Sequence, residues 1–167
     1  MLLKIAAAIL FITAGTASGA AAAKKIHDDT VICRSIFALL QHISILIRTT
    51  GMDVYKLVFE LKRTETLAPL QFIANLPDAF DPGTDFHYCW QKAVGSYNYG
   101  SEEKRVLLTL GNELGRSDIP GQLAVIEALQ EDIAATERHR TDELHKKARL
   151  YRSVGTLFGV MAGILVI

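Results

Sequence analysis

The chain has 167 residues, half of them hydrophobic, and its 18 basic and 18 acidic side chains give a formal net charge of zero. The charge of the whole chain therefore indicates no particular class of partner. Its two cysteines, Cys33 and Cys89, exclude a disulfide framework, show no metal-binding spacing and suit a reducing compartment.

The amino-terminal segment is a candidate membrane span. Residues 5–23 are nineteen uncharged residues. As a helix they measure roughly 28 Å, close to the hydrocarbon core of roughly 30 Å. Gly15, Gly19 and Ala23 share one helix face, where a second helix can approach closely. We expect residues 1–25 to form a transmembrane anchor.

A second interpretation of this segment is a cleaved signal peptide. The segment is rich in alanine, contains a candidate cleavage region at residues 17–20 and has Lys4 as its only preceding basic side chain. The uncharged run is longer than the ~7 to 15 apolar residues usual in signal peptides, which favours the anchor. If cleavage occurs, the chain is an exported helical protein with a membrane-associated carboxyl-terminal segment.

The region between the two ends is predicted to be all-α, because its apolar residues recur at helical spacing. The helix at 31–47 has apolar residues around most of its circumference, so it is expected to be central and buried, with His42 as a core histidine. Gly51 is expected to end this helix. Shorter helices are expected at 53–61, 69–76, 85–94 and 101–114.

A tight helical hairpin is predicted next. Gly115 is expected to end one helix in the left-handed conformation, and Ser117 or Asp118 is expected to cap the following one, which tolerates Pro120 in its first turn. So short a connection makes the two helices antiparallel neighbours. Their contact is expected to use Leu107, Leu110 and Leu114 against Leu123, Ile126 and Leu129.

The last helix is expected to continue towards a second membrane segment. No glycine or proline occurs between Gly121 and Gly155, and residues 154–167 carry no charge. That uncharged run reaches only roughly 21 Å as a helix, so a half-inserted position remains an alternative to a full span. Gly155, Gly159 and Gly163 lie on one face and predict close helix packing, which would suit an assembly such as a homo-oligomer.

Basic residues near the two apolar segments predict the orientation of the chain, because lysine and arginine prefer the cytoplasmic side of a span. They follow the first segment and precede the second: Lys24, Lys25, Lys146, Lys147, Arg149 and Arg152. We therefore expect an anchor at 1–25, a helical cytoplasmic domain at 26–152 and a membrane-inserted helix at 153–167.

Nothing in the sequence points to catalysis. It contains no Gly-Lys pair and hence no phosphate-binding loop, and neither the Gly-x-Ser-x-Gly nor the His-Glu-x-x-His motif occurs. The five histidines show no ligand spacing, so no metal or cofactor is expected. Anionic lipid headgroups explain the basic run 138–152 better than nucleic acid does, because an apolar terminus follows it.

One motif carries a family resemblance. It comprises Leu110, Gly111, Leu114, Gly115, Arg116, Ser117, Asp118 and Gln122 in fixed spacing, followed by Lys147, Tyr151 and Gly155. With the amino-terminal span, the basic pair and the helix around Trp90, this pattern resembles stage III sporulation protein AB. The chain departs from the expected family pattern at residues 50–53, where Thr-Gly-Met-Asp follows the first helix of the central region.

The resemblance implies a helical cytoplasmic domain like those of type II secretion F platform proteins. It implies a non-enzymatic platform in the mother-cell membrane around the forespore. Such a platform would join other subunits of a membrane channel to a cytosolic secretion-type ATPase.

Overall fold

The computed structural model describes the backbone of residues 2–51, 53–77, 79, 81–83 and 85–166. Side chains are described within those ranges except at 2–23, 25, 26, 144, 148, 149, 151, 152 and 155–166. The described backbone contains five α-helices and two 3-10 helices and no strand, which confirms the all-α prediction. The elements are α1 (Leu2–Thr50), α2 (Val54–Lys62), η1 (Glu65–Leu67), η2 (Gln71–Asn75), α3 (Phe86–Gly95), α4 (Ser101–Glu113) and α5 (Ile119–Val166).

The chain divides into two compact units, one of Met1–Asp28 with Arg138–Ile167 and one of Asp29–Glu137. Both divisions fall inside continuous helices, because α1 and α5 each run without a break from one unit into the other. In the first unit, Glu143 accepts from Lys147 at 3.4 Å and lies 3.9 Å from His139, and all three side chains are exposed or half-exposed. His139 and Glu143 are therefore a solvated pair.

The core of the second unit begins on one face of α1. Ile36, Leu39, Leu40, Ile43 and Ile47 are buried at the i, i+3, i+4 spacing of a single helix face. The opposite face is exposed and carries Arg34, Gln41, His42 and Ile45. The prediction of a core histidine at position 42 is therefore wrong, and α1 is covered on one side rather than all round.

One segment of the described residues, His27–Thr50, is long and apolar enough to cross a membrane by length and composition. The same segment supplies the buried face of α1, and a core helix passes this test equally well. The predicted span at 5–23, and that at 154–167 except for Val154, lie outside the residues whose side chains are described.

The helix expected at 69–76 is a short 3-10 helix at Gln71–Asn75, and another 3-10 helix at Glu65–Leu67 precedes it. Their backbone hydrogen bonds join residues three apart, from Leu67 to Thr64, Leu70 to Leu67 and Ile73 to Leu70. Pro69 lies between the turns and has no N–H to continue an α-helical ladder. The segment nevertheless buries the apolar residues expected of it, which are Leu70, Phe72, Ile73 and Leu76.

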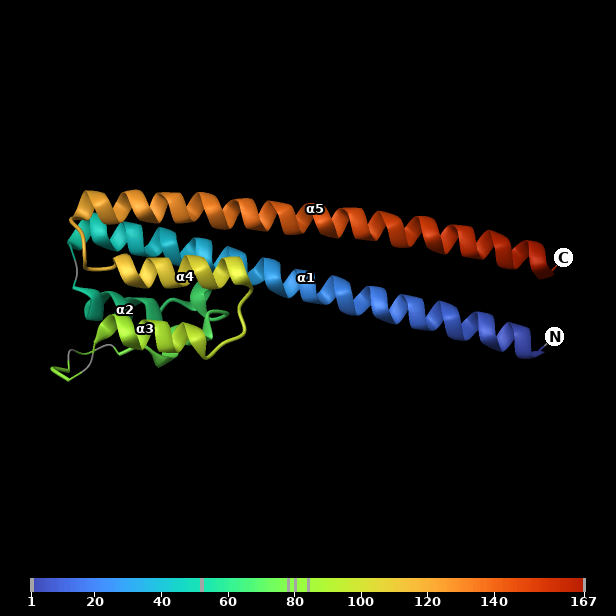
Figure 1. Ribbon diagram of the computed structural model, residues 1–167, viewed down its shortest axis with the longest axis horizontal. Coiled ribbons are helices and arrows are strands. Elements are labelled where there is room, and N and C mark those ends of the chain that lie inside the picture. The colour runs from blue at the N-terminus through green and yellow to red at the C-terminus, as the bar shows by residue number, and fades with distance from the viewer. Residues whose placement is uncertain (1, 52, 78, 80, 84, 167) are drawn as a thin grey trace. The chain divides into compact units, whose positions relative to one another are not determined.

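Within the second unit, α4 lies between α3 on one side and α1 and α5 on the other (Figure 1). The buried Cys33 thiol of α1 donates to Glu103 Oε1 of α4 at 3.2 Å, and Arg34 of α1 pairs with Glu137 of α5 at 2.6 Å. Arg105 of α4 pairs with Asp132 of α5 at 2.9 Å. These pairings make α5 antiparallel to α1 and to α4.

Candidate partner-binding site at the helical hairpin

The α4–α5 connection is a turn closed by three hydrogen bonds. The Gly115 N–H donates to Gln122 Oε1 at 3.2 Å, and Gln122 Nε2 donates to the Ser117 carbonyl at 2.6 Å. Asp118 Oδ1 accepts from the Gly121 N–H at 3.1 Å and so caps α5, as predicted. Gln122 thus ties the first turn of α5 back to the end of α4.

Gly115 has a φ of 75°, the left-handed conformation predicted for it. A Cβ at this position would lie 3.2 Å from Val54 Cγ1 of α2. The backbone at Gly115 therefore passes close to α2 as well as reversing the chain.

Gly111 is required for a different reason, which is the contact between α4 and α3. A Cβ on Gly111 would lie 2.1 Å from Trp90 Cδ1, where no atom fits. Trp90 is fully buried and donates from Nε1 to the Leu107 carbonyl at 2.7 Å. His87 Nδ1 lies 2.7 Å from the Gly111 carbonyl oxygen. The glycine leaves room for the indole against the α4 backbone.

The eight motif residues therefore gather at one hairpin in the second unit. Leu110 and Leu114 are buried in the core, and Gly111, Gly115, Ser117, Asp118 and Gln122 make the contacts described above. Arg116 is exposed. The close contact between Gly111 and Trp90 could not be predicted from the sequence, because the tryptophan lies 21 positions earlier, on another helix.

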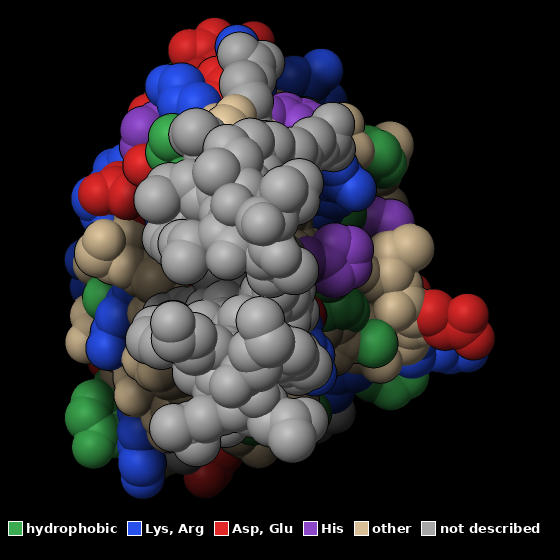
Figure 2. Space-filling view, turned by 90° about the vertical axis from the view of Figure 1, so that its right-hand side faces the viewer, with side chains coloured by type: hydrophobic (Ala, Val, Ile, Leu, Met, Phe, Trp, Pro, Cys, Tyr) green, Lys and Arg blue, Asp and Glu red, His purple; other side chains and the backbone are tan. Residues whose placement is uncertain are grey.

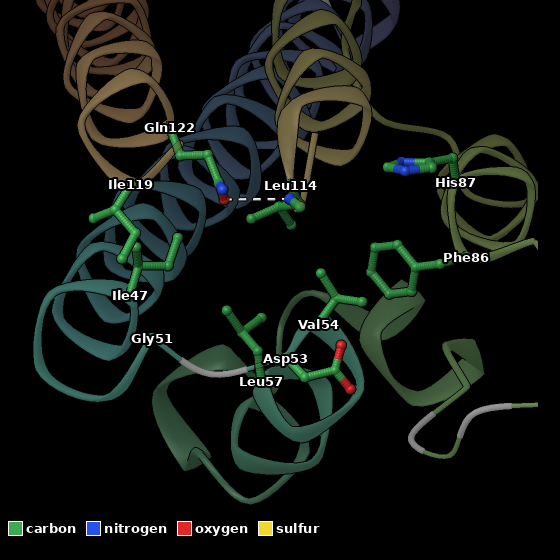
Figure 3. A pocket seen from close by; sticks show the side chains of 11 residues that line it. Ile47, Gly51, Asp53, Val54, Leu57, Phe86, His87, Leu114, Ile119 and Gln122 are labelled. Carbon is green, nitrogen blue, oxygen red and sulfur yellow. Dashed lines mark hydrogen bonds between the residues drawn. The ribbon is translucent and has the colours of Figure 1, made fainter. Parts of the chain in front are cut away.

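A pocket of about 240 Å³ lies beside this hairpin (Figure 3). It forms where the α1–α2 turn and the α4–α5 turn meet the start of α3. Apolar side chains supply most of the wall, and Asp53, His87 and Gln122 supply the polar side chains. The lining residues are Ile47, Gly51, Asp53, Val54, Leu57, Phe86, His87, Leu114, Gly115, Ile119 and Gln122.

The pocket wall includes residues from the place where the sequence departs from the family pattern. Gly51 ends α1 with a φ of 55°, and Asp53 occupies the N-cap position of α2 without a side-chain capping bond. The pocket itself was not predicted, because its walls come from four helices that are distant in the sequence.

Electrostatics around the pocket are set by carboxylates. Burial, and after it the negative charge of Asp53, raises the pKa of the Tyr55 phenol, with smaller contributions that include Asp85 and Asp81. At the far side of α4, hydrogen bonds to Asp132 and Glu102 raise the pKa of Arg105, so that guanidinium stays charged. Asp53 is the only acidic residue in the lining, which contains no lysine or arginine.

The predicted membrane-facing residues are only partly described. Lys24, Lys146 and Lys147 are exposed, whereas the side chains of Lys25, Arg149 and Arg152 lie outside the described set. The packing glycines Gly15, Gly19, Gly155, Gly159 and Gly163 also lie outside it. On the face shown in Figure 2, basic side chains are interspersed with acidic and histidine side chains.

The thiols and carboxylates form no metal centre in the described part of the chain, where no group of three or more His, Cys, Asp or Glu is suitably placed. Neither cysteine forms a disulfide; Cys33 is buried and donates to Glu103, and Cys89 is half-buried.

Residues 4–167 match the family of stage III sporulation protein AB, which covers nearly the whole chain. No curated protein and no solved structure matches. The chain therefore belongs to the stage III sporulation protein AB family, a membership that implies a role in sporulation within the stage III sporulation channel complex.

Proposed function

We propose that this chain is a non-enzymatic membrane platform that couples a cytosolic secretion-type ATPase to the sporulation channel. Family membership supports a role in the channel complex. The proposal of an ATPase partner rests on the resemblance to secretion platform proteins. A binding role is supported by the hairpin of residues 110–122, where motif side chains form hydrogen bonds that hold a turn beside a pocket.

The proposed membrane arrangement rests on the sequence of the two ends. Residues 1–25 would span the mother-cell membrane around the forespore, residues 26–152 would face the cytoplasm, and residues 153–167 would enter the same membrane. The exposed Lys24, Lys146 and Lys147 support this arrangement, since cations at such positions gain ~1 kcal/mol each near anionic headgroups.

Assembly in the bilayer would use the two glycine faces. Membrane helices have little hydrophobic drive to associate, so close backbone packing at small residues supplies much of the attraction. Gly15 and Gly19 on one segment and Gly155, Gly159 and Gly163 on the other provide such faces for channel subunits or for a second copy of this chain.

The ATPase coupling is tested by co-purification. The full chain, tagged and extracted in a neutral maltoside detergent, should retain a cytosolic secretion-type ATPase of the same organism after washing in moderate salt. A tagged membrane protein of unrelated fold is the control. Retention equal to that control would contradict the platform function.

The rival function is an exported helical protein, which the alanine-rich amino terminus supports. Intact mass distinguishes the two. The platform account expects the amino-terminal segment to be present on the mature chain, whereas export predicts the loss of about 20 residues by signal-peptide cleavage.

A further inference from the structure

We propose that the pocket between the α1–α2 and α4–α5 turns receives a basic side chain, arginine or lysine, presented by a partner protein. This inference deepens the proposed function and rests on it, because it assigns the surface through which the platform holds a cytosolic partner. The size of the pocket, its apolar wall and the exposed carboxylate of Asp53 support it.

The size of the pocket selects a side chain over a cofactor. Pockets that hold drug-sized ligands and cofactors enclose roughly 300 to 1,000 Å³. The pocket here holds about 240 Å³. Protein interfaces concentrate their binding energy where one long side chain of the partner fills a pocket of this kind.

The wall of the pocket suits an aliphatic stem. Ile47, Leu57 and Leu114 are buried and Val54 is half-buried, and they face a common space in Figure 3. Ile119 is 46% exposed and lies on the same pocket, so it offers apolar contact to the partner chain that carries the inserted side chain. Methylene groups of lysine and arginine bury readily against such surfaces while the charged end reaches polar groups.

The Asp53 carboxylate is the acceptor of the pocket that a partner can reach. Gln122 uses its carbonyl on the Gly115 N–H and its amide on the Ser117 carbonyl. His87 Nδ1 lies 2.7 Å from the Gly111 carbonyl oxygen, which can only accept, so Nδ1 carries a proton. Asp53 makes no capping bond to α2 and is exposed.

Charge complementarity therefore favours a cation. Asp53 is the only acidic residue of the lining, which contains no lysine or arginine. After burial, its negative charge is the largest cause of the raised pKa of the adjacent Tyr55 phenol. Arg48, Lys56 and Arg116 are exposed and lie close in sequence to lining residues, yet none of them lines the pocket. A donor-rich cationic tip pairs with the Asp53 carboxylate and an anion does not.

The experiment measures binding of small probes to the full chain in neutral maltoside micelles by saturation-transfer NMR. The probes are n-butylguanidinium, n-butylammonium and the neutral near-isostere N-butylurea. We expect at least one of the two cations to bind about tenfold or more tightly than N-butylurea, because hydrogen bonds to charged groups are stronger than neutral ones.

Two variants assign the preference to the pocket. Asp53→Asn keeps the size of the side chain and removes its charge, and should abolish the preference for the cation. Asp81→Asn removes a carboxylate that does not line the pocket and should leave the preference unchanged. An unchanged melting temperature of each variant shows that the fold is retained.

The outcomes separate this inference from the proposed function. Equal binding of the three probes, no binding of any probe, or an unchanged preference in Asp53→Asn overturns the basic-side-chain pocket, even where the ATPase co-purifies. A cation preference that depends on Asp53 supports the pocket, and if the ATPase then fails to co-purify, the platform function alone is overturned.

Discussion

Gly111 shows how one residue fixes the contact between two helices. Its missing side chain leaves room for the Trp90 indole, whose Cδ1 would lie 2.1 Å from an added Cβ. Because both the helix backbone and a fully buried indole would have to move, we expect Gly111→Ala to lower the free energy of unfolding by about 1 to 3 kcal/mol. Thermal unfolding of the full chain, followed by circular dichroism, measures this.

The matched control for that prediction is Gly95→Ala in the last turn of α3. A Cβ at Gly95 would meet nothing within 4 Å, and alanine is favoured over glycine in helices. We expect the melting temperature to stay constant or to rise. Equal melting temperatures for the two variants would show that Gly111 has no packing role.

Gly115 fixes the hairpin through its backbone conformation. With φ at 75°, a branched side chain is strained, and its Cβ would also press on Val54. We expect Gly115→Val to destabilise the fold by about 1 kcal/mol or more. Gly115→Asn should be less destabilising, since asparagine tolerates the left-handed region. A valine variant as stable as the asparagine variant would contradict the assigned conformation.

Backbone conformations and helix caps were predictable where they depend on residues within a few positions of one another. The left-handed Gly115 and a cap of α5 at Ser117 or Asp118 were predicted from spacing and residue type, and the structure shows Gly115 in that conformation and Asp118 as the cap. The exposure of His42 was not predicted, because the sequence of an apolar helix does not show how many neighbours pack on it and which face they cover.

At the scale of elements, the sequence predicts where helices begin and end better than it predicts the hydrogen-bonding pattern within them. The ends of α2, α3 and α4 lie close to the expected positions, whereas the segment around Pro69 forms 3-10 turns in place of one helix. Apolar spacing located the buried residues of that segment but not its hydrogen bonding, which the proline decides. The pocket could not be predicted at all, since it arises from tertiary contact.

The cap of α5 gives a prediction at this scale. Asp118 Oδ1 accepts from the Gly121 N–H, so Asp118→Ala leaves a helix-end donor without its partner. We expect a loss of about 1 kcal/mol in the free energy of unfolding, measured by chemical denaturation. Ser117→Ala is the control, because Ser117 accepts from Gln122 through its backbone carbonyl, which the substitution keeps. The free energy of unfolding of this variant should change little. Equal losses in the two variants would contradict the cap.

For the whole molecule, insertion and assembly of the membrane segments should be separable. Gly159→Leu adds bulk in the middle of the predicted glycine face and makes the segment more apolar. The variant chain should therefore stay in the membrane fraction and retain the ATPase. It should lose crosslinking to its channel neighbours, because the helices can no longer pack closely. Spore formation should fall. Val160→Leu, one position around the helix, is the control, and identical behaviour of the two variants would mean that the glycines have no packing role.

The placement of the central region relative to the membrane is the claim on which the platform account depends most. Reporters that are active only in the cytoplasm, or only outside it, are fused after residue 100 and after residue 167 in sporulating cells. The account predicts cytoplasmic activity after residue 100 and external activity after residue 167. External activity after residue 100 would place residues 26–152 outside the cytoplasm, out of reach of any cytosolic ATPase, and would contradict the account.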